Sequence, residues 1–309
     1  MQRMAKTRGV RGAAGQCALA AILYLLAKYL LTALISFLMG ARVAGSSLAA
    51  PTGFSQATVL FFELLIGVGA FAAPLFWLLC TTRLRAPDLR LTIPAGWSPG
   101  FCLCVFLGLA NAGNVLGGLL GRLLGSGNTA TALPQGGSGL LMAFLTLCVM
   151  PAVCEELFFR GALQGLMRPC GSAVAIFAPA LLFALLHFDL AQGITAILCA
   201  VFLGWLTERI GSILPGMLLH FINNCLAFLS LYLGQYAPGD VALAYQLVLL
   251  LALPPLGLWM AWRAHRQGFR FSSGMRPGVA PLAFLSTPAY LVAVVFLLAF
   301  GIFLAVAHG

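Results

Sequence analysis

Charge is scarce in this chain. Charged residues make up 8% of its 309 residues, while hydrophobic residues make up 61%. Soluble globular domains usually carry about a quarter charged residues, so this composition excludes an ordinary soluble domain. The useful unit is instead the apolar run of about 20 residues that can cross a bilayer as a helix.

Acidic residues and metal-binding motifs are rarer still. The chain has 7 Asp and Glu residues against 17 Lys and Arg, a net charge of +10. The basic residues lie between apolar runs, where they act as topology signals, so we expect no nucleic-acid partner. The chain has 9 cysteines but no CxxC or HExxH motif, and Cys102-x-Cys104 has the wrong spacing for an ordinary zinc site. We expect the cysteines to be small buried hydrophobic residues.

What the sequence does contain is a series of apolar segments. Their lengths are typical of transmembrane helices, and they predict an all-α, polytopic transmembrane bundle of about nine spans. The predicted spans cover residues 16–39, 57–80, 100–124, 139–166, 172–190, 191–208, 212–235, 241–262 and 289–308. The boundary between the fifth and sixth spans rests only on Asp189 and Gln192.

Basic residues mark alternate connections between these spans. They precede the first span and follow the second, fourth, sixth and eighth: Arg3, Lys6, Arg8, Arg11, Arg83, Arg85, Arg90, Arg168, Arg209, Arg263, Arg266, Arg270 and Arg276. Because positive residues collect on the cytoplasmic side, we expect a multi-pass protein of the cell (inner or plasma) membrane. Its N-terminus is expected to be cytoplasmic and its C-terminus external.

Small residues form a ladder in the third span. Glycine recurs every four residues there, at Gly113, Gly117, Gly121 and Gly125. Such spacing lets two helices approach closely. The sequence leaves open whether the partner helix lies in the same chain or in a second copy.

The most informative residues are two adjacent glutamates, Glu155 and Glu156, in the fourth span. A charge at mid-bilayer costs roughly 2.5–3.5 kcal/mol, so the pair indicates a functional site. Glu156 and Arg160 are four residues apart, the favourable spacing for a helical ion pair. We therefore expect Glu156 to be structural and Glu155 to face a cavity. Pro151 removes a helical hydrogen bond just before them, and a kink there would admit water.

Histidines in two neighbouring spans fall at the same depth as the glutamates. His187 lies in the fifth span, while His220 and Asn224 share one face of the seventh; Asn223 is expected to face elsewhere. At 1.5 Å per residue, these side chains lie ~12 to ~22 Å from the basic ends of their spans, as Glu155 does. The sequence predicts one shared site in the membrane, suited to hydrolysis, a metal or a proton path.

These residues also form three ordered motifs. Residues 155–160 match EExxxR, residues 183–187 match FxxxH, and residues 220–224 match HxxxN. In this order they resemble the CPBP intramembrane proteases, a family with type II CAAX prenyl endopeptidases and bacterial relatives linked to bacteriocin processing and self-immunity. The resemblance implies a four-helix catalytic core in residues 139–235. Three spans in residues 1–138 and two in 236–309 would flank it.

The resemblance also implies roles. Glu155 and His187 would activate a water that attacks a peptide bond of a membrane-associated substrate, and His220 and Asn224 would stabilise the oxyanion. Glu156 and Arg160 would support the site. In a metalloprotease, Glu155, His187 and His220 would instead hold one divalent ion such as zinc. Asn224 suits an oxyanion donor better than a zinc ligand, which favours the metal-free mechanism.

Two other functions fit the same residues. A proton-coupled transporter would use Glu155, His187 and His220 as a relay, but we find no inverted repeats. A non-catalytic scaffold or immunity protein of the same fold would be expected to have lost one of the polar residues. Lys28 and Glu63, in the first two spans, would form a structural ion pair, unless Lys28 extends to the membrane surface.

Overall fold

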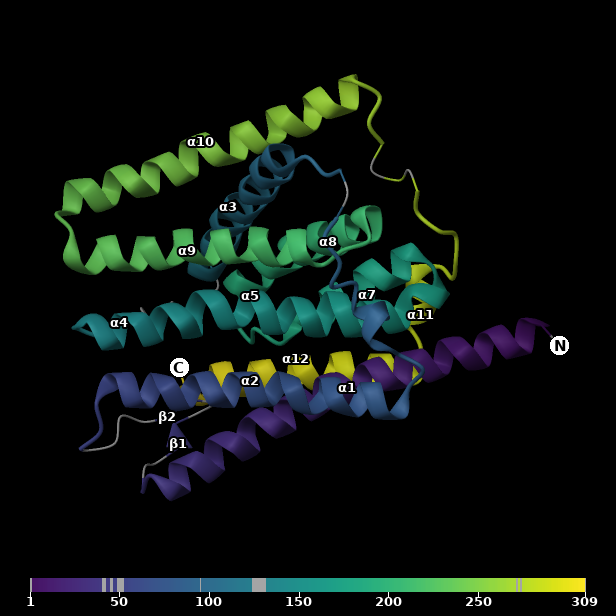
Figure 1. Cartoon of the computed structure of the whole chain (residues 1–309), viewed down its shortest axis with the longest axis horizontal. Coiled ribbons are helices and arrows are strands. Elements are labelled where there is room, and N and C mark those ends of the chain that lie inside the picture. The colour runs from purple at the N-terminus through teal and green to yellow at the C-terminus, as the bar shows by residue number, and fades with distance from the viewer. Residues whose placement is uncertain are drawn as a thin grey trace.

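The protein is a bundle of long helices that run roughly side by side (Figure 1). The computed structural model describes residues 2–40, 43–44, 47–48, 53–94, 96–123, 132–270, 272 and 274–308. Gly125 of the predicted glycine ladder lies outside them. Within these residues the only strands are a two-residue antiparallel pair, β1 (Val43–Ala44) and β2 (Ser47–Leu48). The predicted all-α transmembrane fold is confirmed.

The helices follow one another with short connections. The first three are α1 (Gln2–Leu38), α2 (Gln56–Thr81) and α3 (Pro99–Leu123), with the 3₁₀ turn η1 (Ala86–Leu89) before α3. A continuous rod follows: α4 (Gly137–Phe144), η2 (Leu145–Val149), α5 (Met150–Glu155), η3 (Glu156–Leu163), α6 (Gln164–Met167) and η4 (Arg168–Cys170). The remaining helices are α7 (Ser172–Leu185), α8 (Leu190–Ile210), α9 (Leu214–Tyr236), α10 (Gly239–Arg266), α11 (Pro281–Leu285) and α12 (Pro288–His308).

Eight of the predicted spans are helices long and apolar enough to cross a membrane. The exception is the predicted span 172–190, whose helix α7 has only 14 residues. At 1.5 Å per residue it is about 21 Å long, short of a bilayer core of about 30 Å. The count of about nine full spans is therefore corrected to eight candidate spans and one short helix.

A tight turn explains why α7 stops early. Phe188 adopts a left-handed backbone conformation (φ 53°), and Asp189 caps α8 by accepting a 2.7 Å hydrogen bond from the Gln192 backbone N–H. The two helices then pack antiparallel, with Gly193 against Ala184 and Gly204 against Ile176. This hairpin places His187 of its turn beside the Phe183 ring, with ring centres 4.8 Å apart, and the same Phe183 ring lies 6.3 Å from the His220 ring.

The rod from α4 to η4 lies at the centre of the bundle. Figure 1 shows α1, α2 and α12 on one side of it and α9 and α10 on the other. Aromatic rings join α1, α2, η3 and α7 around it: Tyr24, Phe71, Phe158, Phe159 and Phe183. Helices from all three predicted parts of the chain pack together, because α12 lies on α1 and α3 lies between α8 and α10. The three-part division stays a prediction.

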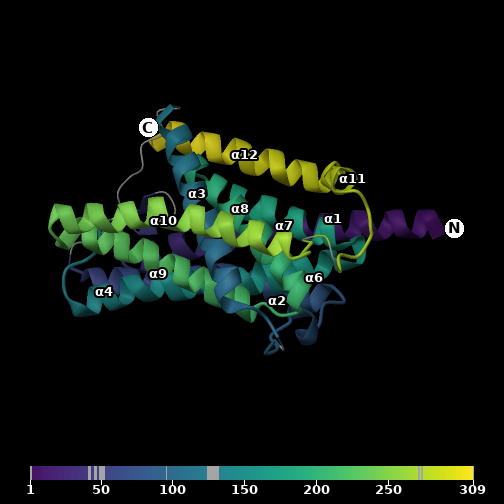
Figure 2. The ribbon, with the colours of Figure 1, turned by 90° about the horizontal axis from the view of Figure 1, so that it is seen from above.

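The two chain ends lie at opposite ends of the bundle (Figure 2), as the predicted topology requires. Which end faces the cytoplasm stays a prediction. The glycine ladder acts within the chain: Gly113 lies against Thr195 of α8, and Gly117 against Ala191.

Arginines gather at the end of the bundle where α8 and α10 finish. Glu208, whose side chain is 6% exposed, pairs there with Arg168 at 2.9 Å, Arg276 at 3.2 Å and Arg90 at 3.3 Å. Burial and then Arg168 lower the pKa of Arg90, and Glu208 opposes both. One buried carboxylate therefore ties three segments that are distant in sequence.

Candidate active site

The central rod changes its winding on both sides of the glutamates. The segments η2 and η3 are wider π-helical turns, and the short α5 between them contains Pro151. Proline cannot donate the backbone hydrogen bond of a regular α-helix, so the distortion expected there takes the form of π turns. Such turns are frequent at functional sites. Glu155 is the last residue of α5, and Glu156 is the first of η3.

Glu156 and Arg160 form the predicted ion pair, with Arg160 Nη1 2.9 Å from Glu156 Oε1. Their side chains are 0% and 2% exposed. The Arg160 guanidinium also lies over the Phe183 ring, 4.6 Å from its centre. Among the described residues, neither terminal nitrogen of Arg160 has a hydrogen-bond acceptor in good geometry, so the pairing is mainly electrostatic.

His220 connects the ion pair to the second glutamate. Its Nδ1 lies 2.9 Å from Glu156 Oε1, and its Nε2 lies 3.9 Å from Glu155 Oε2. Because a carboxylate only accepts hydrogen bonds, Nδ1 carries the proton and donates to Glu156. Gly216, one turn before His220, makes room for this contact: a Cβ there would lie 3.2 Å from Glu156 Oε2.

His187 lies in the turn after α7. Its Nδ1 lies 2.8 Å from the Phe183 carbonyl oxygen, which can only accept, so Nδ1–H donates this bond. In the neutral ring, Nε2 then presents a lone pair. The ring orientation is thus fixed by the helix end, and Nε2 is the nitrogen left for a water or substrate.

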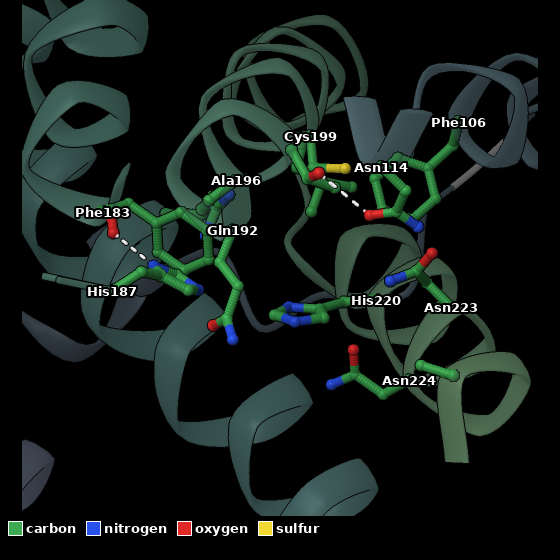
Figure 3. A pocket seen from close by; sticks show the side chains of 14 residues that line it. Phe106, Asn114, Phe183, His187, Gln192, Ala196, Cys199, His220, Asn223 and Asn224 are labelled. Atoms are coloured by element: carbon green, nitrogen blue, oxygen red, sulfur yellow. Dashed lines mark hydrogen bonds between the residues drawn. The ribbon is translucent and has the colours of Figure 1, made fainter. Parts of the chain in front are cut away.

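A cavity of about 250 Å³ lies between α3, α7, α8 and α9, and His187, His220 and Asn224 all line it. Figure 3 shows the Gln192 side chain between the two imidazoles, with Asn223 and Asn224 beside His220. The expectation that Asn223 faces elsewhere is wrong, since it also lines the cavity. Glu155 is not among the lining residues; its carboxylate, 19% exposed, faces His220 instead.

Residues 137–226 match the family model described as type II CAAX prenyl endopeptidase Rce1-like. This part of the chain, less than a third of its length, is similar to that domain and is named the Rce1-like domain; the match is consistent with the CAAX protease family. Comparisons with curated proteins and with solved structures give no significant match. The Rce1-like domain spans α4 to the middle of α9, so it contains all six of the predicted site residues.

The Rce1-like domain does not supply all of the cavity wall. Asn114 comes from α3, outside the matched residues, and accepts a 2.9 Å hydrogen bond from Thr195 Oγ1. Sequence reasoning missed Asn114, Gln192 and Thr195 as site residues. An available signal was the amide side chain of Asn114 in an apolar span, one residue after Gly113 of the ladder.

The predicted metal ligands are only partly brought together. Glu155 and His220 lie within reach of one ion, since two ligands of a zinc ion are each about 2 Å from it. Within the described part of the chain, however, no three His, Cys, Asp or Glu side chains converge on one point. The three predicted ligands therefore do not converge on one metal position in this arrangement.

Lys28 adds a positive charge near the glutamates from α1. It lies close enough to interact electrostatically with Glu155 and, more weakly, with Glu63 of α2. The predicted ion pair of Lys28 with Glu63 stays a prediction, and Glu155 is a second carboxylate within electrostatic reach of Lys28. Lys28 and Glu63 lie outside the Rce1-like domain.

Proposed function

We propose that the chain is an intramembrane endopeptidase that hydrolyses peptide bonds of membrane-associated substrates. The observation that carries this proposal is the linked set Glu155–His220–Glu156–Arg160 next to a polar cavity inside a transmembrane bundle. Membrane-spanning segments carry buried charges rarely, and usually for function. The match to a CAAX protease family points to the same chemistry.

Glu155 is the proposed general base. Its Oε2 lies 3.9 Å from His220 Nε2, too far for a direct hydrogen bond, so this carboxylate oxygen can accept a hydrogen bond from a bound water. Glu155 takes a proton from this water as the oxygen bonds to the substrate carbonyl carbon. When the carbon–nitrogen bond breaks, Glu155 returns the proton to the leaving amine. Water is consumed, and one carboxylate and one amine are formed.

The remaining residues would orient the reactants. His187 Nε2 would accept a hydrogen bond from the water, because Nδ1 is held by the Phe183 carbonyl. The Asn224 amide, which lines the cavity, would donate to the oxyanion. His220 could donate there only with both nitrogens protonated, since its Nδ1 proton goes to Glu156.

The direct test compares peptide ends in membranes of cells that express wild type or Glu155→Gln at equal levels. We expect new C-termini only with wild type, and their sequences would identify the substrates. Asp240→Asn is the matched control, because it removes an exposed carboxylate in the first turn of α10. It should cleave like wild type.

Other results of this assay would contradict the proposed base or favour a different function. Identical peptide ends with wild type and Glu155→Gln would contradict the proposed base. A pH-dependent flux of a solute across the membrane, found in place of cleavage, would favour a proton-coupled transporter. Repeating the assay with a chelator tests the metal: loss of cleavage that zinc restores would favour a metallopeptidase with Glu155 and His220 as ligands.

A further inference from the structure

A second cavity lies at the arginine-rich end of the bundle, away from the candidate active site. It measures about 620 Å³ and is formed by the start of α3, the end of α8, the end of α10 and the segment that follows α10. The proposed peptidase chemistry uses none of its residues. Most of it lies outside the Rce1-like domain, since only Arg209 of its lining residues falls within residues 137–226.

Positive charge dominates this cavity. Three arginines line it, Arg209, Arg263 and Arg270, and no acidic side chain is among its described lining residues. The neighbouring arginine cluster around Glu208 differs, because Glu208 forms ion pairs there with Arg90, Arg168 and Arg276. Guanidinium groups offer several N–H donors in a planar fork that matches phosphate oxygens. The second cavity therefore has the charge and donors for an anion.

Other groups at the rim add to this. Ser98 lines the cavity just before the first residue of α3, and the amino end of a helix carries a positive dipole. The carboxyl ends of α8 and α10 have the opposite dipole, and backbone N–H groups of Gly211 and of residues 267–269 cap their last carbonyls. These partial charges are smaller than the full charges of the three arginines, so a negative ligand is still favoured.

The cavity also has an apolar wall. Phe101 and Phe269 make an edge-to-face contact, with ring centres 5.9 Å apart, and Met260 lies beside them. The Arg209 guanidinium lies over the Phe269 ring, 5.1 Å from its centre, which holds that charge at the cavity. An anion with an attached apolar part fits this combination of arginines and aromatic rings.

We propose that this cavity binds the phosphate group of an anionic membrane phospholipid. The phosphate would lie among Arg209, Arg263 and Arg270, and the glycerol and first acyl carbons would lie on Phe101, Met260 and Phe269. The cavity lies where α8 and α10 end, which is the depth of lipid headgroups for spans of this length. Nonspecific attraction between the positively charged end of the bundle and anionic lipids would not require a cavity. The presence of a lined cavity therefore favours a defined binding site.

The test uses the full-length protein in nanodiscs of phosphatidylcholine with about one-tenth phosphatidylglycerol. Native mass spectrometry, after the protein is released from the nanodiscs, counts the phospholipids that stay bound to it. We expect one retained phosphatidylglycerol per protein, and about 10-fold weaker retention after Arg263→Gln with Arg270→Gln, because charged hydrogen bonds to the phosphate are lost. A second arm titrates inorganic phosphate onto protein in pure phosphatidylcholine nanodiscs, which distinguishes free phosphate from lipid as the source.

The matched control is Arg83→Gln with Arg266→Gln. It removes the same charge near the ends of α2 and α10, but neither residue lines the cavity. Selective retention by wild type and by this control, but not by the cavity variant, supports the site. Equal losses in both variants, or no preference for phosphatidylglycerol or phosphate in wild type, would overturn it. Glu155→Gln should retain lipid normally, so this outcome is separate from the fate of the peptidase proposal.

Discussion

Breaking the buried Glu156–Arg160 pair is a quantitative test of how the site is held. In Arg160→Met, the carboxylate of Glu156 stays fully buried and loses its counter-charge. His220 Nδ1 remains its only hydrogen-bond donor on Oε1, and Oε2 has no partner among the described residues. Removing one member of a buried pair costs about 3–5 kcal/mol. The folded-to-unfolded ratio should therefore fall by about 10² to 10³·⁵.

The double variant Glu156→Leu with Arg160→Met separates the charge effect from lost packing. It leaves no buried charge, and apolar replacements of buried ion pairs are often neutral or stabilising. We expect it to be at most about 1 kcal/mol less stable than wild type, the cost of leaving His220 Nδ1 without an acceptor. It should nevertheless have lost most peptidase activity, because nothing then orients the His220 ring.

The assay is equilibrium unfolding in mixed detergent micelles, followed by helical circular dichroism, for wild type, both single variants and the double variant. The expected coupling energy is several kcal/mol, because the double variant is more stable than either single variant. Energies that add to within about 0.5 kcal/mol would refute the reasoning. Such additivity would mean that the two charges do not depend on each other.

Three further variants test other parts of the account. Gly117→Ala should destabilise the protein by about 1–3 kcal/mol in thermal unfolding, because the added Cβ would overlap the Ala191 backbone. Gly118→Ala is the control and should not destabilise it, because a Cβ there has nothing within 4 Å. Equal effects of the two variants would contradict the α3–α8 packing. Gly216→Ala should lower the cleavage rate more than the melting temperature, because the added methyl group presses on Glu156 Oε2; unchanged cleavage would show that this carboxylate need not be held in place. Asn224→Ala should lower kcat by about 10²–10³ with little change in unfolding, and wild-type kcat would remove Asn224 as an oxyanion donor.

The sequence predicted those parts of the site that depend on helical spacing. The four-residue spacing of Glu156 and Arg160 predicted their ion pair, and the spacing of His220 and Asn224 predicted their common face. Both follow from the periodicity of one helix. Matching depths in different spans also predicted one shared site, and His187 and His220 do line one cavity, whereas Glu155 does not.

What the sequence could not predict depends on contacts between helices. The hydrogen bond from His220 to Glu156 requires the approach of α9 to η3. Gly216 permits this approach, but a single glycine in the sequence does not predict it. Asn114 and Thr195 reach the cavity only because Gly113 and Gly117 let α3 approach α8 closely. The shortness of α7 arises from four turn residues, 186–189, in an otherwise apolar stretch, which hydrophobicity alone reads as part of a span.

The most direct test of the central claim uses purified protein. Wild type, Glu155→Gln and Asp240→Asn would be incubated with membrane peptides in water enriched in ¹⁸O, and the products analysed by mass spectrometry. The account predicts new C-terminal carboxylates that each carry one ¹⁸O with wild type and Asp240→Asn, and none with Glu155→Gln. Labelled C-termini that form equally fast with Glu155→Gln would contradict it.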